Sequence, residues 1–342
     1  MTIKKYTEIM KLSVVIAVGS LSGIAYGADD KSMNNCLLSE IKVSAKDVTV
    51  DQLYSLCEER LGENEATNKS VKLGAISRRI IEERKTEFDP YVLTPHKMNY
   101  ILPVLTTDNI NKGAYNDFAE WSDNLENLES KFQISLKVPM NHEDMFVNGY
   151  ALFFGFTLQS WWQIYSDDIS KPFRETNYQP EVFYLAPLNW HPLGGNTGVM
   201  VGLEHQSNGR TQLLSRSWNR VYLNFLYEKD NFALSFKPWF RLSEDDKLNE
   251  SDAEGDDNPD IGDYMGHFEL SAIYKTSDYE FSIKGRQNFS EHHGGVELGF
   301  TFPLWGKLRG YAQFTKGYGE SLIDYNHDQQ RFGLGIALTN VL

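Results

Sequence analysis

Residues 232–242 read FALSFKPWFRL, and every second residue from Phe232 to Leu242 is apolar. The residues between them are mostly small, polar or charged: Ala233, Ser235, Lys237, Trp239 and Arg241. Successive side chains of a β-strand point to opposite faces, so the pattern predicts a strand with one continuous apolar face. Residues 296–302 repeat it, because Val296, Leu298, Phe300 and Phe302 alternate with Glu297, Gly299 and Thr301. A β-sandwich would show the same alternation, so a second feature must distinguish the two folds.

The connections between the strand-like segments provide that feature. About twelve such segments follow one another from residue 97 onward. Long connections are expected at 106–127, 166–176, 207–215, 243–260, 287–293 and 318–329. Short connections lie between them, for example at 227–231, 275–279 and 303–307. Long loops at one end, tight turns at the other and an even strand count are typical of outer-membrane barrels. The sequence therefore predicts an all-β fold, a twelve-stranded antiparallel transmembrane β-barrel.

Six tryptophans lie near the ends of the expected strands: Trp161, Trp162, Trp190, Trp218, Trp239 and Trp305. Aromatic girdles at the two membrane interfaces explain such positions, and tryptophans of a protein core are the alternative. Trp161 and Trp162 are adjacent on one strand and must face opposite ways. At least one of them therefore lies outside any single core.

The first residues predict export. Lys4, Lys5 and Lys11 precede an apolar run at 12–24, which ends in the small-residue pattern of residues 25–27. This is the arrangement of a cleaved secretory signal peptide, expected to span residues 1–27. No later segment has the roughly 18 to 20 consecutive apolar residues of a transmembrane helix. An exported bacterial chain that closes a barrel is expected in the outer membrane.

Residues 28–88 differ in pattern from the rest, with helical periodicity at 50–61 and 71–84. The chain has two cysteines, Cys36 and Cys57, both in this part. Export to an oxidising compartment favours a disulfide between them over two unpaired thiols. We expect a small, mainly helical periplasmic extension without chemistry of its own, followed by a barrel domain at 89–342. The net charge of −14 excludes nucleic acid as the expected partner and is compatible with cation binding.

The densest group of reactive side chains lies in 203-LEHQSNGRTQLLSRSWNR-220. His205 and Ser207 are two apart on a strand, so they share a face, with β-carbons about 7 Å apart. That face also holds Val199, Val201 and Leu203, and the apolar face of a barrel strand contacts lipid. Asn219 shares its face with Val221, Leu223 and Phe225 on the returning strand. If the hairpin pairs symmetrically about Gln212, Asn219 lies directly opposite His205.

Three polar residues on a lipid-facing wall are costly unless they have a function. Near the membrane surface the cost falls, so a harmless histidine and serine at the rim are the alternative. As a Ser-His-Asn triad the roles are clear: His205 accepts the Ser207 proton, and Asn219 fixes the orientation of the imidazole. Ser207 would then attack a lipid ester from the membrane side.

Several motifs in this order resemble those of the outer-membrane phospholipases A. The main ones are HQSNGR at 205–210 and SRSWNR at 215–220, and the others are SWWQ at 160–163, PFRETNY at 172–178, DDNPDI at 256–261 and GYGESLIDYN at 317–326. The resemblance covers about residues 89–342. It implies calcium-dependent hydrolysis of phospholipid acyl esters with little positional preference (phospholipase A1, A2 and lysophospholipase activity) and activation as a homodimer.

The resemblance also implies residue roles, transferred position by position. His205, Ser207 and Asn219 match the family triad, and the amide of Gly209 matches the oxyanion donor. The Ca²⁺ ligands implied are the Arg210 carbonyl, the Ser215 hydroxyl and Ser170 from the neighbouring subunit, with Asp257 at an additional calcium position. Without the resemblance, Ser215 would be interpreted as an ordinary loop serine, and Asp257 as a solvated residue of an acidic loop.

The chain departs from the family at Leu158, where members often carry a glutamine expected to hydrogen-bond across the dimer, and Lys171 follows Ser170. Two other functions compete with the phospholipase. A passive porin or structural barrel would place its polar groups in the lumen rather than on the lipid side. A soluble secreted esterase would need a G-x-S-x-G nucleophile elbow and helices between its strands.

Overall fold

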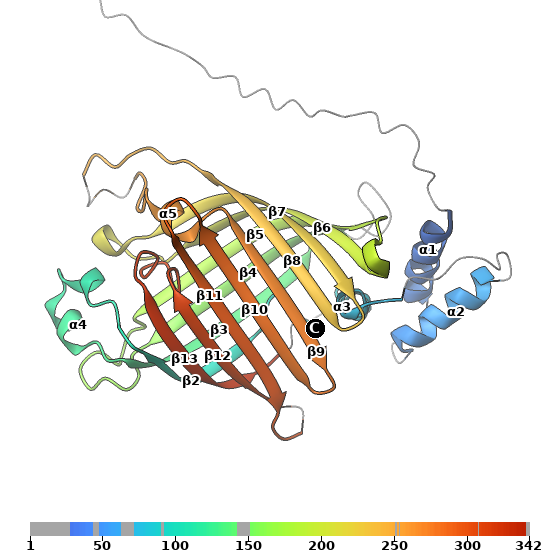
Figure 1. Ribbon diagram of the computed structural model, residues 1–342, viewed down its shortest axis with the longest axis horizontal. Helices are drawn as coiled ribbons and strands as arrows, with labels where there is room; N and C mark the ends of the chain where they lie inside the picture. The colour runs from blue at the N-terminus through green and yellow to red at the C-terminus, as the bar shows by residue number, and fades with distance from the viewer. Residues whose placement is uncertain are drawn as a thin grey trace, which may run out of the picture.

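The computed structural model describes residues 28–43, 48–62, 72–89, 92–141, 151–249, 252, 254–306 and 308–339. The expected signal peptide lies outside these residues. Twelve long strands form the body of the molecule (Figure 1): β2 (Tyr100–Thr107), β3 (Leu128–Pro139), β4 (Ala151–Trp162), β5 (Glu175–Leu188), β6 (Asn196–Ser207), β7 (Ser217–Lys229), β8 (Phe232–Leu242), β9 (Phe268–Thr276), β10 (Tyr279–Asn288), β11 (His293–Pro303), β12 (Arg309–Gly317) and β13 (Gln329–Ala337). A further short strand, β1 (Thr94–Pro95), pairs with β3.

The sheet closes on itself. Each long strand pairs antiparallel with its neighbour in sequence, and β13 pairs with β2 through Leu334 and Val104 among others. Closure leaves none of these twelve strands with an unpaired edge. The predicted fold, a twelve-stranded antiparallel β-barrel, is confirmed.

Loop lengths differ between the two ends of the barrel. One end carries the connections at 108–127, 163–174, 208–216, 243–267 and 318–328, and also the short one at 289–292. The other end carries the tight turns at 230–231 and 277–278 and the turn at 304–308. We call these the long-loop end and the short-loop end. The expected alternation is present in most connections. The exceptions are 289–292, which is much shorter than its counterparts, and 140–150 at the short-loop end, which is as long as 318–328.

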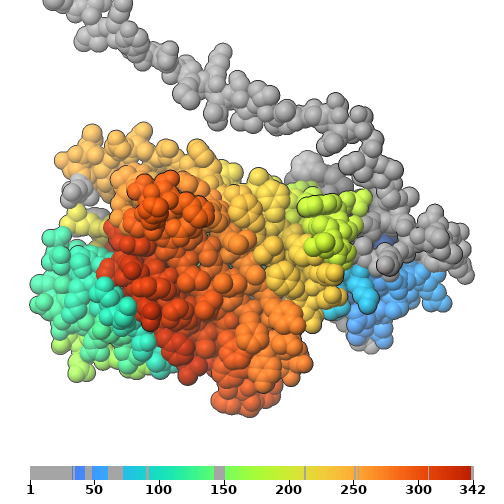
Figure 2. Space-filling view, in the orientation of Figure 1, coloured from blue at the N-terminus to red at the C-terminus, as the bar shows by residue number. Residues whose placement is uncertain are grey.

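The outer face of the barrel is apolar. On ten strands a large aliphatic or aromatic side chain is between 37% and 50% exposed: Ile101, Ile134, Val182, Val201, Leu223, Phe236, Leu270, Ile283, Leu298 and Leu334. Alternate residues point inward and are buried, such as Lys131, Glu181 and Glu204. This is the arrangement of a barrel that faces lipid outside and polar groups inside. Figure 2 shows β9–β13 as one packed wall, in orange and red.

The tryptophans divide between the two faces, which corrects the expectation of a girdle. Trp161, Trp218 and Trp239 are buried inside the barrel, each with a partner for its indole N–H: Glu320 Oε1 at 3.3 Å, Gln206 Oε1 at 2.9 Å and the Gly266 carbonyl at 3.1 Å respectively. Trp162 lies on the outer face, and Trp190 and Trp305 are 65% and 70% exposed. The polar lumen satisfies a tryptophan N–H that lipid would leave unpaired.

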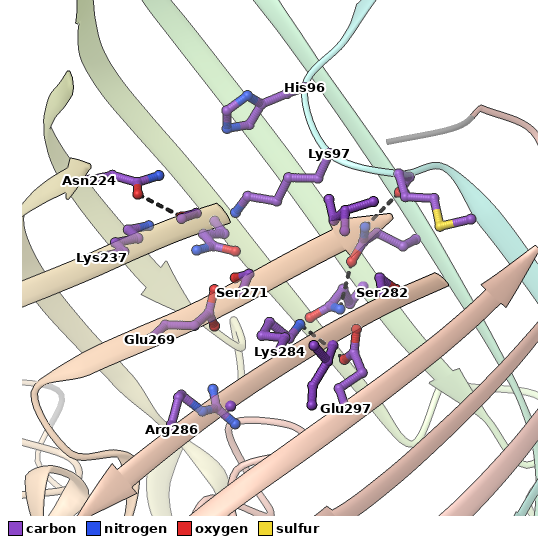
Figure 3. Close-up of a pocket in the computed structure, with 18 of the residues that line it drawn as sticks. His96, Lys97, Asn224, Lys237, Glu269, Ser271, Ser282, Lys284, Arg286 and Glu297 are labelled. Carbon is purple, nitrogen blue, oxygen red and sulfur yellow. Dashed lines mark hydrogen bonds and ion pairs between the residues drawn. The ribbon is translucent and has the colours of Figure 1, made fainter. Parts of the chain in front are cut away.

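Ion pairs fill much of the lumen. Lys237 contacts Glu204 at 2.7 Å, Lys284 contacts Glu297 at 3.0 Å, and Lys131 contacts Glu320 at 2.8 Å. Between these side chains a cavity of about 460 Å³ remains. Figure 3 shows Lys97, Lys237, Glu269, Lys284 and Glu297 pointing into it from several strands. The lumen is therefore a packed polar interior with a cavity rather than an open channel.

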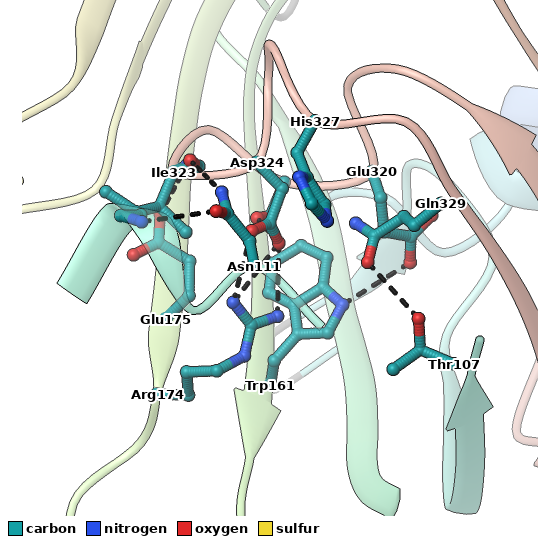
Figure 4. Close-up of polar contacts among 12 residues, drawn as sticks. Thr107, Asn111, Trp161, Arg174, Glu175, Glu320, Ile323, Asp324, His327 and Gln329 are labelled. Carbon is teal, nitrogen blue, oxygen red and sulfur yellow. Dashed lines mark hydrogen bonds and ion pairs between the residues drawn. The ribbon is translucent and has the colours of Figure 1, made fainter. Parts of the chain in front are cut away.

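A buried charged cluster closes the lumen at the long-loop end. Arg174 donates to Glu129 Oε2 at 2.9 Å and contacts Asp324 at 3.1 Å, and Arg331 pairs with the same glutamate. None of the four side chains is exposed. Figure 4 shows Arg174 and Asp324 beside Asn111 and Glu175. Short helices lie in the loops at this end: η1 (Gly113–Tyr115), α4 (Ala119–Asn124), η3 (Gln212–Leu214) and α5 (Ile261–Met265).

The N-terminal extension lies at the short-loop end, where η2 (Pro192–Gly194) is also found. It contains α1 (Ala28–Val43), α2 (Val50–Gly62) and α3 (Ala75–Arg84), and α1 has no counterpart in the predicted helices. A disulfide joins Cys36 to Cys57. Glu228 of β7 accepts hydrogen bonds from the amides of Gly74 and Ser77 at 3.2 and 3.0 Å, which caps α3 and holds it at the barrel mouth. No described helix is long and apolar enough to cross a membrane.

Candidate active site

The hairpin of β6 and β7 brings the predicted triad residues to one face. Its register pairs His205 with Asn219 and Ser207 with Ser217, as the expected symmetry about Gln212 requires. Their neighbours Glu204 and Arg220 are buried in the lumen, whereas Val201 and Leu203 are exposed on the outside. His205, Ser207 and Asn219 therefore lie on the outer wall, close to the long-loop end (Figure 1).

His205 and Asn219 are hydrogen-bonded. The distance between His205 Nδ1 and Asn219 Oδ1 is 2.8 Å. An amide oxygen only accepts, so Nδ1 is the donor in this bond, and in a neutral imidazole Nε2 then keeps its lone pair. Ser207 lies two residues along the same face, and no hydrogen bond joins it to His205 among the described residues. The imidazole is therefore in the tautomer that a general base for Ser207 requires.

A carboxylate continues this hydrogen-bonded series. Asn219 Nδ2 donates to Glu244 Oε1 at 2.8 Å. Glu244 follows β8 closely, and Leu242 at the end of β8 pairs with Asn219 in the sheet register. The series Glu244, Asn219, His205 thus runs from the loop after β8 to β7 and β6.

The loop after Ser207 is braced by Asn208, which is 3% exposed. Its side-chain oxygen accepts from the amides of Arg210 and Arg216 at 3.2 and 3.0 Å, and its Nδ2 donates to the Leu214 carbonyl at 2.8 Å. This bracing places Gly209 at the exposed tip with φ of +63°, a conformation that favours glycine. Among the described hydrogen bonds none uses the Gly209 amide, so it is available to an outside acceptor.

An apolar surface adjoins Ser207. The sheet register pairs Ser207 with Tyr178, Tyr178 with Leu158, and Leu158 with Ile134. Tyr178 and Ile134 are 38% and 50% exposed. An acyl chain lying along this row of β3, β4 and β5 would contact apolar side-chain surface next to the serine hydroxyl.

Two of the four predicted calcium ligands, Ser215 and Asp257, contact each other directly. Ser215 Oγ donates to Asp257 Oδ2 at 2.7 Å, and Lys247 forms an ion pair with the other oxygen of Asp257. Ser170 lies in the loop at 163–174, where its carbonyl accepts from Trp162 Nε1 at 2.6 Å. No hydrogen bond joins Ser170 to Ser215 in the described part of the chain.

The other predicted ligand is a backbone oxygen. The Arg210 guanidinium is fixed to the carbonyls of Phe173 and Arg174 at 2.7 and 2.6 Å. No group of three or more His, Cys, Asp or Glu side chains able to hold a metal occurs in the described ranges. A cation here would therefore depend on hydroxyl, carbonyl and single carboxylate oxygens.

Three residues of the site were absent from the sequence-based prediction. Asn208 lies inside the quoted HQSNGR motif, so its position could have been noticed. Glu244 and Lys247 lie in an acidic loop with no periodicity. Glu244 contacts Asn219 of β7, and Lys247 contacts Asp257 ten residues further along the loop. No spacing rule predicts such contacts.

Comparisons with known proteins identify the family of the chain. A family model described as phospholipase A1 matches residues 76–338. Phospholipase A1 of Escherichia coli K12 is 38% identical over 280 residues, which cover 81% of this chain and 92% of the relative. Phospholipase A1 of Klebsiella pneumoniae is 35% identical over 275 residues, covering 80% and 91% respectively.

Solved structures agree as well. The outer membrane phospholipase A from Escherichia coli has a TM-score of 0.68 at 37% identity, covering 75% of this chain and 95% of that one. A Salmonella typhi outer membrane phospholipase dimer with bound calcium has a TM-score of 0.67 at 36% identity, covering 74% and 94%. The chain hydrolyses phospholipids at the bacterial outer membrane, and it belongs to the phospholipase A1 family.

Proposed function

We propose that Ser207 is the nucleophile of this phospholipase, His205 its general base, and Asn219 the residue that orients His205. The observation that carries the proposal is the 2.8 Å hydrogen bond between His205 and Asn219 on the lipid-facing wall, two residues from Ser207. Polar groups that face lipid are retained when they serve a function. A phospholipid in the surrounding leaflet would reach Ser207 laterally.

The reaction follows from the tautomer of His205. Ser207 Oγ attacks the ester carbonyl carbon while His205 Nε2 accepts the hydroxyl proton. The imidazolium then donates that proton to the departing alcohol, and a water molecule repeats the sequence to release the fatty acid. The amide of Gly209, which no described group accepts from, would donate to the developing oxyanion. The family resemblance extends the proposal to both ester positions and to lysophospholipids.

Calcium is the proposed cofactor. It prefers hydroxyl, carbonyl and carboxylate oxygens, the donors that Ser215, the Arg210 carbonyl and Asp257 offer. The ion pair of Asp257 with Lys247 indicates that this carboxylate attracts a cation. When bound, calcium would supply positive charge that stabilises the oxyanion. The relative from Salmonella typhi binds calcium as a dimer.

A homodimer is the proposed active form. Ser170 and Ser215 lie in different loops, at 163–174 and 208–216, which fits Ser170 acting on the calcium of a second copy. One barrel wall offers only half of a groove for an acyl chain, and two walls packed through their Ser207 faces would complete it. Membrane disturbance that lets monomers meet would then switch on hydrolysis.

The test is phospholipid hydrolysis by the detergent-refolded chain, with calcium and with chelator. We expect Ser207→Ala to lower kcat by at least about 10³-fold. Ser290→Ala, an exposed serine at the same end of the barrel, should leave it unchanged. A folded Ser207→Ala variant that still released fatty acid would refute the assignment of the nucleophile. Chemical crosslinking during turnover tests the dimer, and a strictly monomeric active enzyme would refute it.

A further inference from the structure

The Asn219 amide has a different partner at each end. Its oxygen lies 2.8 Å from His205 Nδ1, and its nitrogen lies 2.8 Å from Glu244 Oε1. Both partners lie on the outer side of the barrel near the long-loop end, and Glu244 is only partly exposed. The side chain is therefore fixed at both ends by groups from two different elements.

This matters because an asparagine amide is nearly symmetric in shape. Rotation by half a turn exchanges its oxygen and nitrogen with little steric change. With the nitrogen toward His205, the imidazole would have to accept at Nδ1 and carry its proton on Nε2. A protonated Nε2 cannot take a proton from Ser207. Asn219 on its own thus permits an inactive arrangement as well as an active one.

Glu244 removes this ambiguity. An ionised carboxylate only accepts hydrogen bonds, so it attracts the amide nitrogen and repels the amide oxygen. The orientation with Oδ1 toward His205 is the one compatible with Glu244.

We propose that Glu244 is a positioning residue for the Ser207 reaction, which acts through Asn219 and holds His205 in its active tautomer. The inference rests on the proposed triad. It adds to the proposed triad, which lies within residues 205–219, a residue from the loop after β8. Glu244 does not touch the substrate in this scheme.

The experiment compares Glu244→Ala, Glu244→Gln and Asp246→Ala in the refolded full chain with calcium present. Asp246 is an exposed carboxylate of the same loop and serves as the matched control. We expect Glu244→Ala to lower kcat about tenfold with KM within twofold, the effect of losing a charge-assisted hydrogen bond away from the substrate. Glu244→Gln keeps the size of the side chain but removes the charge, and its amide can donate as well as accept. It therefore no longer selects one orientation of the Asn219 amide and should lower kcat to a similar extent.

A second readout does not depend on lipid turnover. The rate at which a sulfonyl fluoride modifies Ser207 should fall in Glu244→Ala in parallel with kcat and remain near normal in Asp246→Ala. Unchanged kcat and modification rate in folded Glu244→Ala would overturn the inference, as would a Glu244→Gln variant with the kcat of the unaltered chain. An active Ser207→Ala enzyme would instead overturn the proposed triad, so the two failures are distinguishable.

Discussion

At the scale of single residues, Asn219 gives the site a neutral partner for its histidine. A carboxylate at this position would place a full charge directly on the lipid-facing strand, where burial in hydrocarbon is costly. The carboxylate lies instead on Glu244, in the loop beyond the end of β8. The negative charge of Glu244 thus stays near the membrane surface. Its hydrogen bond still orients the Asn219 amide that contacts His205.

Leu158 is the residue at which a change should strengthen the dimer. It lies on the outer wall beside Tyr178, in the row that leads to Ser207. In Leu158→Gln the amide faces lipid on an isolated barrel, whereas two copies facing each other would pair their amides. We expect calcium to produce a larger crosslinked dimer fraction in Leu158→Gln at equal protein-to-detergent ratio, a gain of about 1 kcal/mol.

The control for this prediction is Phe281→Gln. Phe281 is exposed on the outer face of β10, on the wall opposite to β4. A dimer gain in both variants would indicate nonspecific association of polar barrels. A loss of dimer in Leu158→Gln would contradict an interface centred on the Ser207 face.

Single residues also show where sequence reasoning succeeded. His205, Ser207 and Asn219 lie on the outer side of the wall because side chains alternate along the two strands of one hairpin. Such alternation can be read from the local sequence. The inward position of Trp218 follows from the same alternation, yet residue type suggested the membrane interface instead. The Asp257 to Ser215 contact joins two loops, and only the family resemblance pointed to it. Glu244 and Lys247 had no local signal at all.

At the scale of elements, the loop at 243–260 contacts both the proposed triad and the proposed calcium ligands. Glu244 contacts Asn219, and Asp257 further along accepts from Ser215. Arg241 holds Asp256 at 2.6 Å, and Asn258 accepts from the Ser217 amide at 3.0 Å. These contacts fix the loop to β7 and β8.

Lys247 in this loop is expected to compete with calcium. Its ammonium is paired with Asp257, which a calcium ion would have to share or take over. Lys247→Met keeps the length of the side chain and removes its charge. We expect calcium to bind about three- to tenfold more tightly to the folded variant, measured by titration calorimetry in detergent.

Lys229→Met, a change at the short-loop end, serves as the control and should leave calcium binding unaltered. Weaker calcium binding in Lys247→Met would show that the lysine supports the site rather than competing for it. Asp257→Asn should weaken binding in either case.

At the scale of the whole molecule, different groups occupy the two ends of the lumen. The cluster of Arg174, Glu129, Asp324 and Arg331 fills the long-loop end. Helix α3 lies at the short-loop end, where Glu83 contacts Lys137 at 2.7 Å and Arg79 contacts the Pro95 carbonyl at 2.8 Å. The family match begins at residue 76, inside α3, so this helix belongs to the region shared with relatives.

Because packed side chains or a helix lie at both ends of the lumen, we expect the barrel not to conduct ions. In a planar lipid bilayer we expect the full chain to give no stable current steps under conditions in which an open porin gives them. Removal of residues 28–88 should still give none, because an ion would have to pass side chains with no exposed surface at the long-loop end. Heat-dependent gel mobility would verify that the shortened barrel is folded. Currents that appear only after the removal would make α3 the sole closure, and currents in the full chain would favour a passive channel in addition to the hydrolase.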